Sequence, residues 1–327
     1  MKHDPVNTHR SLLDEGTEDH TAASLTDYEM QKAEWRGPLR AAVIYEIVRR
    51  AGDHELERPT KSLIFSSIAA GIVITLSVLT EAYLRQALPE TEWAHLIEAM
   101  GYTTGFIFVI LARQQLFTES TISAVLPVLA KPTWNNLYAV ARLWTIVFLG
   151  NLIGTAFFAL WFTLYPPAGP ETLDAIREIS MRAMEPGFVE TVMRGVCAGF
   201  LIAGVAWLLP SSRGFELHVI FLITYIIALG EFSHVIAGSA EAWYLAFGGH
   251  SGVFEVIFGF IVPALIGNVI GGTVLFAFLA FGQVVAELDE TPAERTNGSP
   301  PIDTNGNQAC PDETQKAAAS AGYETRT

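Results

Sequence analysis

The stretch LARQQLFTES, residues 111–120, decides the fold that we expect for this chain. It lies between two apolar runs, GFIFVI (residues 105–110) and ISAVLPVLA (residues 122–130). Charged and hydrogen-bonding side chains are costly in lipid. A backbone that leaves the helix inside a bilayer must find its hydrogen bonds in protein or in a water-lined passage. The stretch therefore predicts a membrane helix that is interrupted beside such a passage.

The composition is that of a membrane protein. Of the 327 residues, 50% are hydrophobic and only 17% are charged. Residues 61–286 contain 14 acidic and 9 basic side chains, so charge is concentrated at the two ends of the chain. We therefore expect a cytoplasmic N-terminal segment (residues 1–60), a membrane domain (residues 61–286) and a disordered cytoplasmic C-terminal tail (residues 287–327). The formal net charge of −14 argues against a nucleic-acid partner.

Six apolar segments are long enough to cross a bilayer, which takes roughly 20 residues. Four are uninterrupted, at about 62–85, 137–165, 188–210 and 252–285, and two are interrupted, at about 101–130 and 216–247. Basic residues gather before the first segment and in alternate connections, whereas the connection 166–187 is acidic. The positive-inside rule then places both termini in the cytoplasm. We predict a multi-pass protein of the lipid bilayer of the cell (inner) membrane.

An amphipathic helix is expected before the first span. Within residues 26–52, the apolar residues Leu39, Val43, Ile44 and Ile47 recur at helical spacing with arginines nearby. We interpret this pattern as a short helix that lies on the cytoplasmic membrane surface. A solvated helix is the alternative.

Each interrupted segment is followed by a similar glycine-rich motif, FLGNLIG at residues 148–154 and LIGNVIG at residues 265–271. The distances from the two interruptions to the motif asparagines, Asn151 and Asn268, are nearly equal. This spacing predicts two repeats of three spans. Because three is odd, the second repeat crosses in the opposite direction, giving an inverted 3+3 repeat with helices 2 and 5 broken. The asparagines are expected to bridge neighbouring helices or, alternatively, to line the pore.

The two interruptions should meet near the middle of the membrane. Half-helix N-termini there, at about residues 118–121 and 236–238, would favour an anion or a polar ligand. His234 lies at the second interruption, where it can donate a hydrogen bond or a proton to a weak acid. A satisfied structural histidine is the alternative.

Three charged residues lie at membrane depth beside the interruptions: Arg113, Glu119 and Glu231. An isolated charge is costly in lipid, and a partner of opposite charge offsets part of that cost. We hypothesise that Arg113 pairs with Glu231 or Glu119. The rival hypothesis is that Arg113 attracts the anion directly.

Four stretches together resemble the formate/nitrite transporter family. They are LFT at Leu116–Thr118, the histidine segment FSHVIAG, and the motifs FLGNLIG and LIGNVIG. The resemblance covers roughly residues 60–286 and is greatest to the subgroup with extended hydrophilic termini. It implies an all-α, aquaporin-like fold, a homopentamer with one pore per protomer, and passage of small monovalent anions such as formate, nitrite or hydrosulfide. It also implies a central site of Thr118 and His234, with Leu116 and Phe117 on a mobile loop.

The same resemblance places three further residues, Phe106, Tyr102 and Ile227, at apolar constrictions; ordinary helix packing is the alternative for them. The chain also departs from the family pattern. Gln115 replaces a glutamate, Glu119 and Ser120 replace glycine and asparagine, and Gly238 stands where asparagine is common. The family's lysine before the fourth span has no match, although Arg182 lies nearby.

The sequence therefore predicts a channel or transporter for small weak-acid anions and not an enzyme. Neither a nucleophile–base pair nor a set of metal ligands occurs at the interruptions, and no cofactor is expected. One alternative is a pore for neutral small solutes, although paired Asn-Pro-Ala motifs are absent. The other is a non-conducting membrane scaffold or sensor that acts through its tails.

Overall fold

The computed structural model describes residues 39–289, and every secondary-structure element in this range is a helix. Five helical stretches are long and apolar enough to cross a membrane. They are Thr60–Ala87, Ala94–Leu111, Trp134–Leu164, Phe188–Ser211 and Val253–Val285. Four of them coincide with the uninterrupted segments predicted from the sequence.

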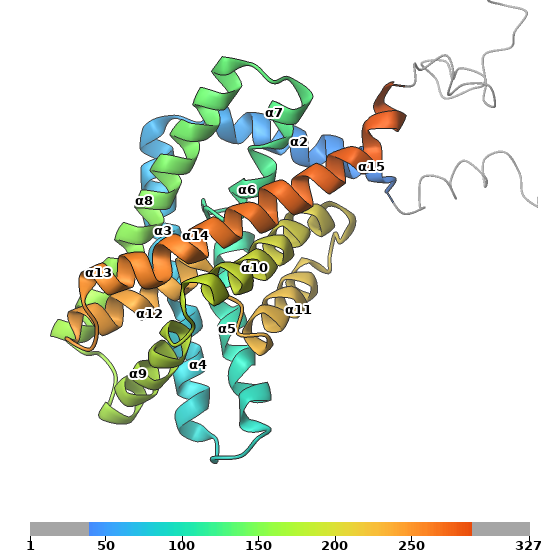
Figure 1. Cartoon of the computed structure of the whole chain (residues 1–327). Coiled ribbons are helices and arrows are strands. Elements are labelled where there is room, and N and C mark those ends of the chain that lie inside the picture. Colours follow the sequence, from blue (N-terminus) through green and yellow to red (C-terminus); the bar gives the residue numbers. More distant parts are fainter. Residues whose placement is uncertain (1–38, 290–327) are drawn as a thin grey trace, which may run out of the picture. The chain divides into compact units, whose positions relative to one another are not determined.

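These stretches consist of the following helices, which Figure 1 labels. The first is α3 (Thr60–Ile74) followed by α4 (Leu76–Ala87), the second is α5 (Ala94–Leu111), the third is α8 (Trp134–Leu164), and the fourth is α10 (Phe188–Leu208) with a 3₁₀ turn, η1 (Leu209–Ser211). The fifth is a continuous helical rod of α13 (Val253–Glu255), η2 (Val256–Ile261), α14 (Val262–Val269), η3 (Ile270–Ala277) and α15 (Phe278–Asp289), in which η2 and η3 are π-helical.

The two interrupted segments contain shorter helices. The first continues beyond α5 with a non-helical segment and the short helices α6 (Ser120–Ser123) and α7 (Leu126–Ala130). The second contains α11 (Glu216–Leu229) and α12 (Val235–Phe247). The chain between α11 and α12 is also non-helical. The side chains that carry the predicted site therefore lie on or beside two non-helical segments.

The glycine-rich motifs bring two pairs of helices into close contact. Gly154 on α8 faces α3, where an added Cβ atom would lie 2.4 Å from the carbonyl oxygen of Ile68. Gly271, in the rod, faces α10 in the same way, and an added Cβ would lie 2.0 Å from the carbonyl oxygen of Val196. Only glycine permits this approach, as in other small-residue helix contacts of membrane proteins. Figure 1 shows the rod running beside α10.

The amphipathic helix is α2 (Ala41–Glu57), and its apolar faces differ from the prediction. The side that packs on the protein carries Tyr45, Val48 and Leu56, which are at most 9% exposed. Of the predicted apolar row, Leu39, Val43 and Ile47 are exposed, at 38–39%, whereas Ile44 is half-buried against the core. The prediction placed one apolar face on this helix, whereas its sequence supplies two. The exposed row is available to the membrane surface, and the other row holds α2 against the helices that follow.

Because α2 packs against the apolar helices, it belongs to their compact unit, which begins at Ala41. Salt bridges stabilise its outer surface: Arg49 bonds to both Glu46 and Asp53. Hydrogen bonds from Arg49 lower the pKa of Glu46 to about 2. The domain limits expected at residues 60/61 and 286/287 stay predictions. Residues 287–289 of the expected disordered tail are helical, because they continue α15. The rest of that tail and the first part of the 26–52 segment lie outside the described residues.

One further helix, α9 (Pro170–Met184), lies in the connection between α8 and α10. Pro170 at its first position and Glu171 in its first turn are typical of a helix start. Helix α9 packs against α4 and α12, with Ile176 and Ile179 buried among its neighbours. This packing directs Arg182 toward Glu98 on α5, to which it bonds.

Candidate functional site

Helices α5 and α11 end in the same kind of turn. After each helix, two consecutive N–H groups bond back to carbonyls of the last turn at 3.0 or 3.1 Å, which is the Schellman pattern. This pattern needs one residue in the left-handed conformation, and here those residues are Arg113 (φ 55°) and Glu231 (φ 49°). A residue other than glycine stays in that conformation only where the surrounding structure fixes it.

Asn151 fixes the segment after α5. Its Oδ1 accepts a hydrogen bond from the N–H of Phe117 at 2.9 Å. Its Nδ2 donates to the carbonyl of Gln115 at 2.9 Å and to that of Ser67, on α3, at 2.8 Å. The asparagine is fully buried, so it replaces the bonds that helical backbone would otherwise have made.

Asn268 makes a matching set of bonds to the segment after α11. Its Oδ1 accepts from the N–H of Val235 at 2.9 Å. Its Nδ2 donates to the carbonyl of Ser233 at 2.8 Å and to that of Gly195, on α10, at 3.0 Å. Asn268 is also fully buried. Both motif asparagines thus bind a non-helical segment to a neighbouring helix, and neither lines the cavity described below.

The side chains of Thr118 and His234 meet. The Thr118 Oγ1 atom lies 2.6 Å from Nε2 of His234, and both residues are at most 1% exposed. The other ring nitrogen, Nδ1, accepts a hydrogen bond from the N–H of Ala237 at 3.1 Å and so caps α12. We assign the proton of the neutral imidazole to Nε2, because Nδ1 is an acceptor. Nε2–H then donates to Thr118, and the threonine hydroxyl keeps its own proton.

The start of α12 differs from the expected open anion site. The sequence predicted free N–H donors at this helix end. In the structure the N–H of Val235 is bonded to Asn268, and that of Ala237 is bonded to His234. Side chains take these donors because the helix start is enclosed by protein. A ligand at this point would therefore meet Thr118 and His234 rather than a row of open backbone N–H groups.

Apolar side chains surround the pair. Phe106 is fully buried, and its ring lies edge-on to His234 with 4.9 Å between ring centroids. Leu116 and Phe117 are also buried, and Phe117 packs on Phe148 with 5.1 Å between centroids. Tyr102 and Ile227, at 8% and 0% exposure, line the same cavity as His234. The structure thus brings the predicted site and constriction residues together; their roles stay predictions.

The predicted pairing of Arg113 with Glu231 is wrong. Glu231 Oε2 lies 3.0 Å from Nη1 of Arg194, on α10. Helix α10 packs beside the end of α11, whereas Arg113 follows α5 and is exposed. In the range 39–289 no ion pair within 4.0 Å joins Arg113 to Glu231 or to Glu119, which is half-buried. Arg113 and Glu231 occupy equivalent positions after two different helices, α5 and α11. The cation that reaches Glu231 is Arg194.

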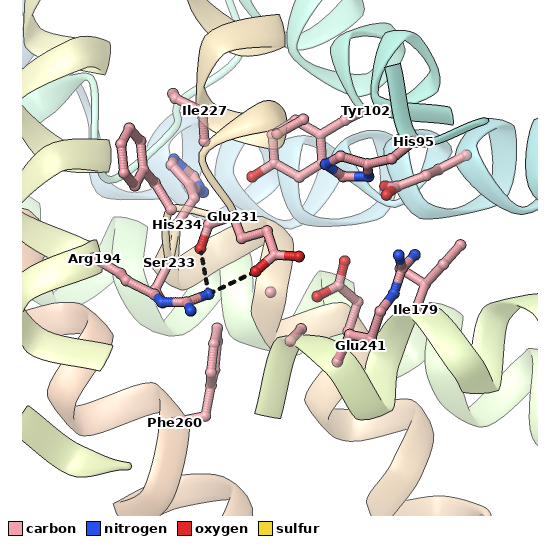
Figure 2. Close-up of a pocket in the computed structure, with 16 residues that line it drawn as sticks. His95, Tyr102, Ile179, Arg194, Ile227, Glu231, Ser233, His234, Glu241 and Phe260 are labelled. Atoms are coloured by element: carbon pink, nitrogen blue, oxygen red, sulfur yellow. Dashed lines mark hydrogen bonds and ion pairs between the residues drawn. The ribbon is translucent and has the colours of Figure 1, made fainter. Parts of the chain in front are cut away.

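A cavity opens beside His234 (Figure 2). The figure shows Arg194 joined to Glu231 and, apart from that pair, the side chains of Glu241, Tyr102 and His95. Glu81 and Arg182 also line the cavity. Arg182 bonds to Glu98, which is 1% exposed.

Glu81 and Glu241, which line this cavity, and Glu98, which bonds to the cavity residue Arg182, were not predicted as site residues from the sequence. An acidic residue inside an apolar segment is the signal that would have indicated them. That signal says nothing about which segments meet, and Glu81, Glu98 and Glu241 come from α4, α5 and α12. Phe260, from η2, gave no signal, because an apolar residue in an apolar span is ordinary.

We expect Gly238→Ala to destabilise the protein. An added Cβ at Gly238 would lie 2.2 Å from Cζ of Phe260, so the ring would have to move. Overpacking of this kind costs about 1–3 kcal/mol. Thermal unfolding in detergent should show a lower Tm for Gly238→Ala. Gly204→Ala is the matched control, because an added Cβ there has only an ordinary contact at 3.5 Å with Phe276.

A second variant tests the cause. Phe260→Leu in the Gly238→Ala background should restore part of the lost Tm, because a smaller side chain leaves room for the methyl group. If the two substitutions are additive, the contact is not the cause. The same contact leaves no room for a larger side chain at Gly238 unless the ring of Phe260 moves.

Comparison with known proteins agrees with this architecture. A family model described as formate/nitrite transporter matches residues 42–282. The inner membrane protein YfdC of Escherichia coli (strain K12) is 38% identical over 284 residues, which cover 87% of this chain and 90% of that protein. The formate channel FocA of the same strain is 23% identical, with 72% and 91% covered. A solved pentameric formate channel with formate bound has a TM-score of 0.59 at 20% identity, covering 70% of this chain and 98% of that one.

Within residues 39–289 the chain is all-helical, with helices long and apolar enough to cross a membrane. The family model and relatives are those of membrane channels and transporters. The chain belongs to the formate/nitrite transporter family.

Proposed function

We propose that this protein is a membrane channel or transporter for small monovalent weak-acid anions, such as formate, nitrite or hydrosulfide. The observation that carries the proposal is the buried hydrogen bond between Thr118 and His234, 2.6 Å long, beside a cavity. The names of several relatives support it, since FocA of Escherichia coli and BtFdhC of Bacillus thuringiensis are formate channels.

In this proposal the two side chains form the central site. The Thr118 hydroxyl, which receives a hydrogen bond from His234 Nε2–H, donates its own proton in a hydrogen bond to the anion. Five surrounding side chains exclude water from the central site: Leu116, Phe117, Phe106, Tyr102 and Ile227. A bare anion is costly in such surroundings, whereas the neutral acid is not. Protonation of the substrate near the centre therefore lowers the barrier to passage.

The proposed architecture is an inverted 3+3 repeat with six spans, in which helices 2 and 5 are broken. Helices α5 to α7 would form the first broken span, and α11 and α12 the second. Three paired features support the repeat: the Schellman turns at Arg113 and Glu231, the matching bonds of Asn151 and Asn268, and the glycine contacts of α8 and of the helical rod. We extend this proposal to the domain limits and to cytoplasmic termini, which the distribution of basic residues favours.

We also propose a homopentamer in the inner membrane. Helix α8 carries a row of exposed apolar residues at intervals of four, namely Leu149, Ile153, Phe157 and Trp161, which are 46–57% exposed. Such a row requires lipid or another protomer to cover it. A solved structure of similar fold is pentameric, and YfdC is an inner membrane protein.

The test is a flux assay with the full-length protein in liposomes. Formate, nitrite, acetate, hydrosulfide, glycerol and water are each offered at several pH values. We expect flux of the small anions, faster at lower pH, with little glycerol flux. Glycerol or water flux without anion flux would identify a neutral-solute pore. No flux of any solute by correctly assembled protein would favour a non-conducting scaffold, and either result contradicts the proposal.

A further inference from the structure

The charges of the cavity are unevenly paired. Both of its arginines have carboxylate partners: Arg194 bonds to Glu231 and Glu190, and Arg182 bonds to Glu98. Two acidic residues then remain, Glu81 on α4 and Glu241 on α12. Within residues 39–289, neither carboxyl group makes a salt bridge or a side-chain hydrogen bond.

Both remaining carboxyl groups are buried. Glu81 is 7% exposed and Glu241 is 6% exposed. The Oε2 atom of Glu81 is inaccessible and has no hydrogen-bond partner, although the residue lines the cavity. A buried ionised carboxylate without a donor is costly, whereas a carboxylic acid carries its own donor. The geometry therefore favours two neutral carboxyl groups.

The other ionisable groups around this pair come from every side of the cavity. They are His95, Glu98 and Tyr102 on α5, Arg182 on α9, Arg194 on α10, and Glu231 before α12. Helix η2 contributes the apolar ring of Phe260. Both arginines are bonded to other carboxylates, and within the described residues neither makes a salt bridge to Glu81 or Glu241. Glu81 and Glu241 line the same cavity as His234, so an anion in this cavity would share it with both carboxyl groups.

We propose that Glu81 and Glu241 form a pair of protonated carboxyl groups that supplies a proton to a weak-acid anion before the anion reaches Thr118 and His234. This inference rests on the proposed anion transport and adds the residues that protonate the substrate. Two ionised carboxylates here would repel an anion, whereas two neutral ones can donate hydrogen bonds to it.

The step is a proton transfer. The O–H bond of one carboxyl group breaks and an O–H bond forms on the anion, or an S–H bond for hydrosulfide. The products are a neutral weak acid and one carboxylate. A hydronium ion from the aqueous side of the cavity then returns the proton to the carboxylate. One proton therefore enters the pore with each anion, and no electron transfer is involved.

The first measurement needs no substrate. Infrared difference spectra between H₂O and D₂O, taken on the full-length protein in lipid at neutral pH, report protonated carboxyl groups by their C=O stretch. We expect Glu81→Gln and Glu241→Gln each to lose a protonated-carboxyl band. Glu171→Gln, an exposed acid at the start of α9, should leave the spectrum unchanged. If neither cavity variant loses a band, the two groups are ionised and the inference fails.

The second measurement is formate flux into liposomes, with a pH dye inside, from pH 5 to 8. Glutamine has no proton to give, so each cavity variant should lose flux by at least about tenfold at neutral pH. The pH dependence of formate flux should flatten in the double variant that carries both Glu81→Gln and Glu241→Gln. Aspartate in place of glutamine, in Glu81→Asp or Glu241→Asp, should restore that pH dependence. Size-exclusion profiles of all variants should match the wild type, as should the flux of Glu171→Gln.

The outcomes separate this inference from the proposed function. If the wild type carries no small anion, the proposed function fails. If the wild type carries formate but the cavity variants keep its flux and pH profile, the proton donors lie elsewhere. Increased flux in the glutamine variants would show that the carboxyl groups exclude anions, which also overturns the inference. A loss of flux with an unchanged pH profile indicates a structural role and overturns it too.

Discussion

Replacing Asn268 by alanine is expected to lower the Tm of the detergent-solubilised protein by on the order of 10 °C. The substitution leaves the buried N–H of Val235 and the carbonyls of Ser233 and Gly195 without their partner. An unsatisfied buried polar group costs about 1–3 kcal/mol, so three such groups cost roughly 3–9 kcal/mol. Asn151→Ala should have a similar effect, because its three bonds are of the same kind.

The matched control is Asn136→Ala. Asn136 also donates from its side chain to a backbone carbonyl, that of Lys131, but the bond is exposed and water can replace it. We expect a change in Tm of no more than about 2 °C there, since exposed substitutions usually alter stability by less than about 0.5 kcal/mol. Equal effects of Asn136→Ala and Asn268→Ala would show that the asparagines do not hold the non-helical segments.

Replacing Thr118 by valine is expected to reduce anion flux by about 10- to 100-fold. Valine has nearly the shape of threonine but lacks the hydroxyl that, in the proposed function, donates to the anion. A hydrogen bond to a charged group contributes about 1.5–3 kcal/mol, which sets this range. Flux of formate into liposomes is the measurement, and the Tm of the variant should stay within a few degrees of the wild type.

Thr155→Val is the control for this prediction. Thr155 is also fully buried and bonds to a side chain, Ser239, at 2.9 Å, but it does not line the cavity. Its substitution should affect stability and leave the flux per assembled protein unchanged. If Thr155→Val lowers flux as much as Thr118→Val does, the hydroxyl of Thr118 is not a specific ligand of the anion. Unchanged flux in His234→Ala would count equally against the central site.

The sequence predicted the helical, membrane-spanning character of the chain well. Apolar runs of 18 to 33 residues satisfy their own backbone as helices and bury their side chains in lipid, so their length alone indicates a span. The interruptions were also visible locally, because polar residues at 111–120 and 230–234 stand out against apolar neighbours. The prediction for α2 was less complete, since periodicity identified one apolar row and missed the buried row of Tyr45 and Val48.

Charge pairing was predicted poorly. Arg113 and Glu231 have opposite charges and similar surroundings in the sequence, which suggested a salt bridge. Each follows the end of a different helix, and the partner of Glu231 is Arg194, whose position depends on the packing of α10 beside α11. A pattern along one segment carries no information about which charge a neighbouring helix presents.

The sequence by itself determined that residues 61–286 form helices that cross a membrane. It also determined the two polar interruptions and the matched asparagine motifs that follow them, because these properties depend on neighbouring residues. Only the tertiary structure decided what the interruptions contact. It placed Thr118 within 2.6 Å of His234, 116 residues away, and gathered Glu81 and Glu241 from different helices into one cavity. Contacts over such separations depend on the close packing of helices at their glycines, so they exist only once those helices have packed together.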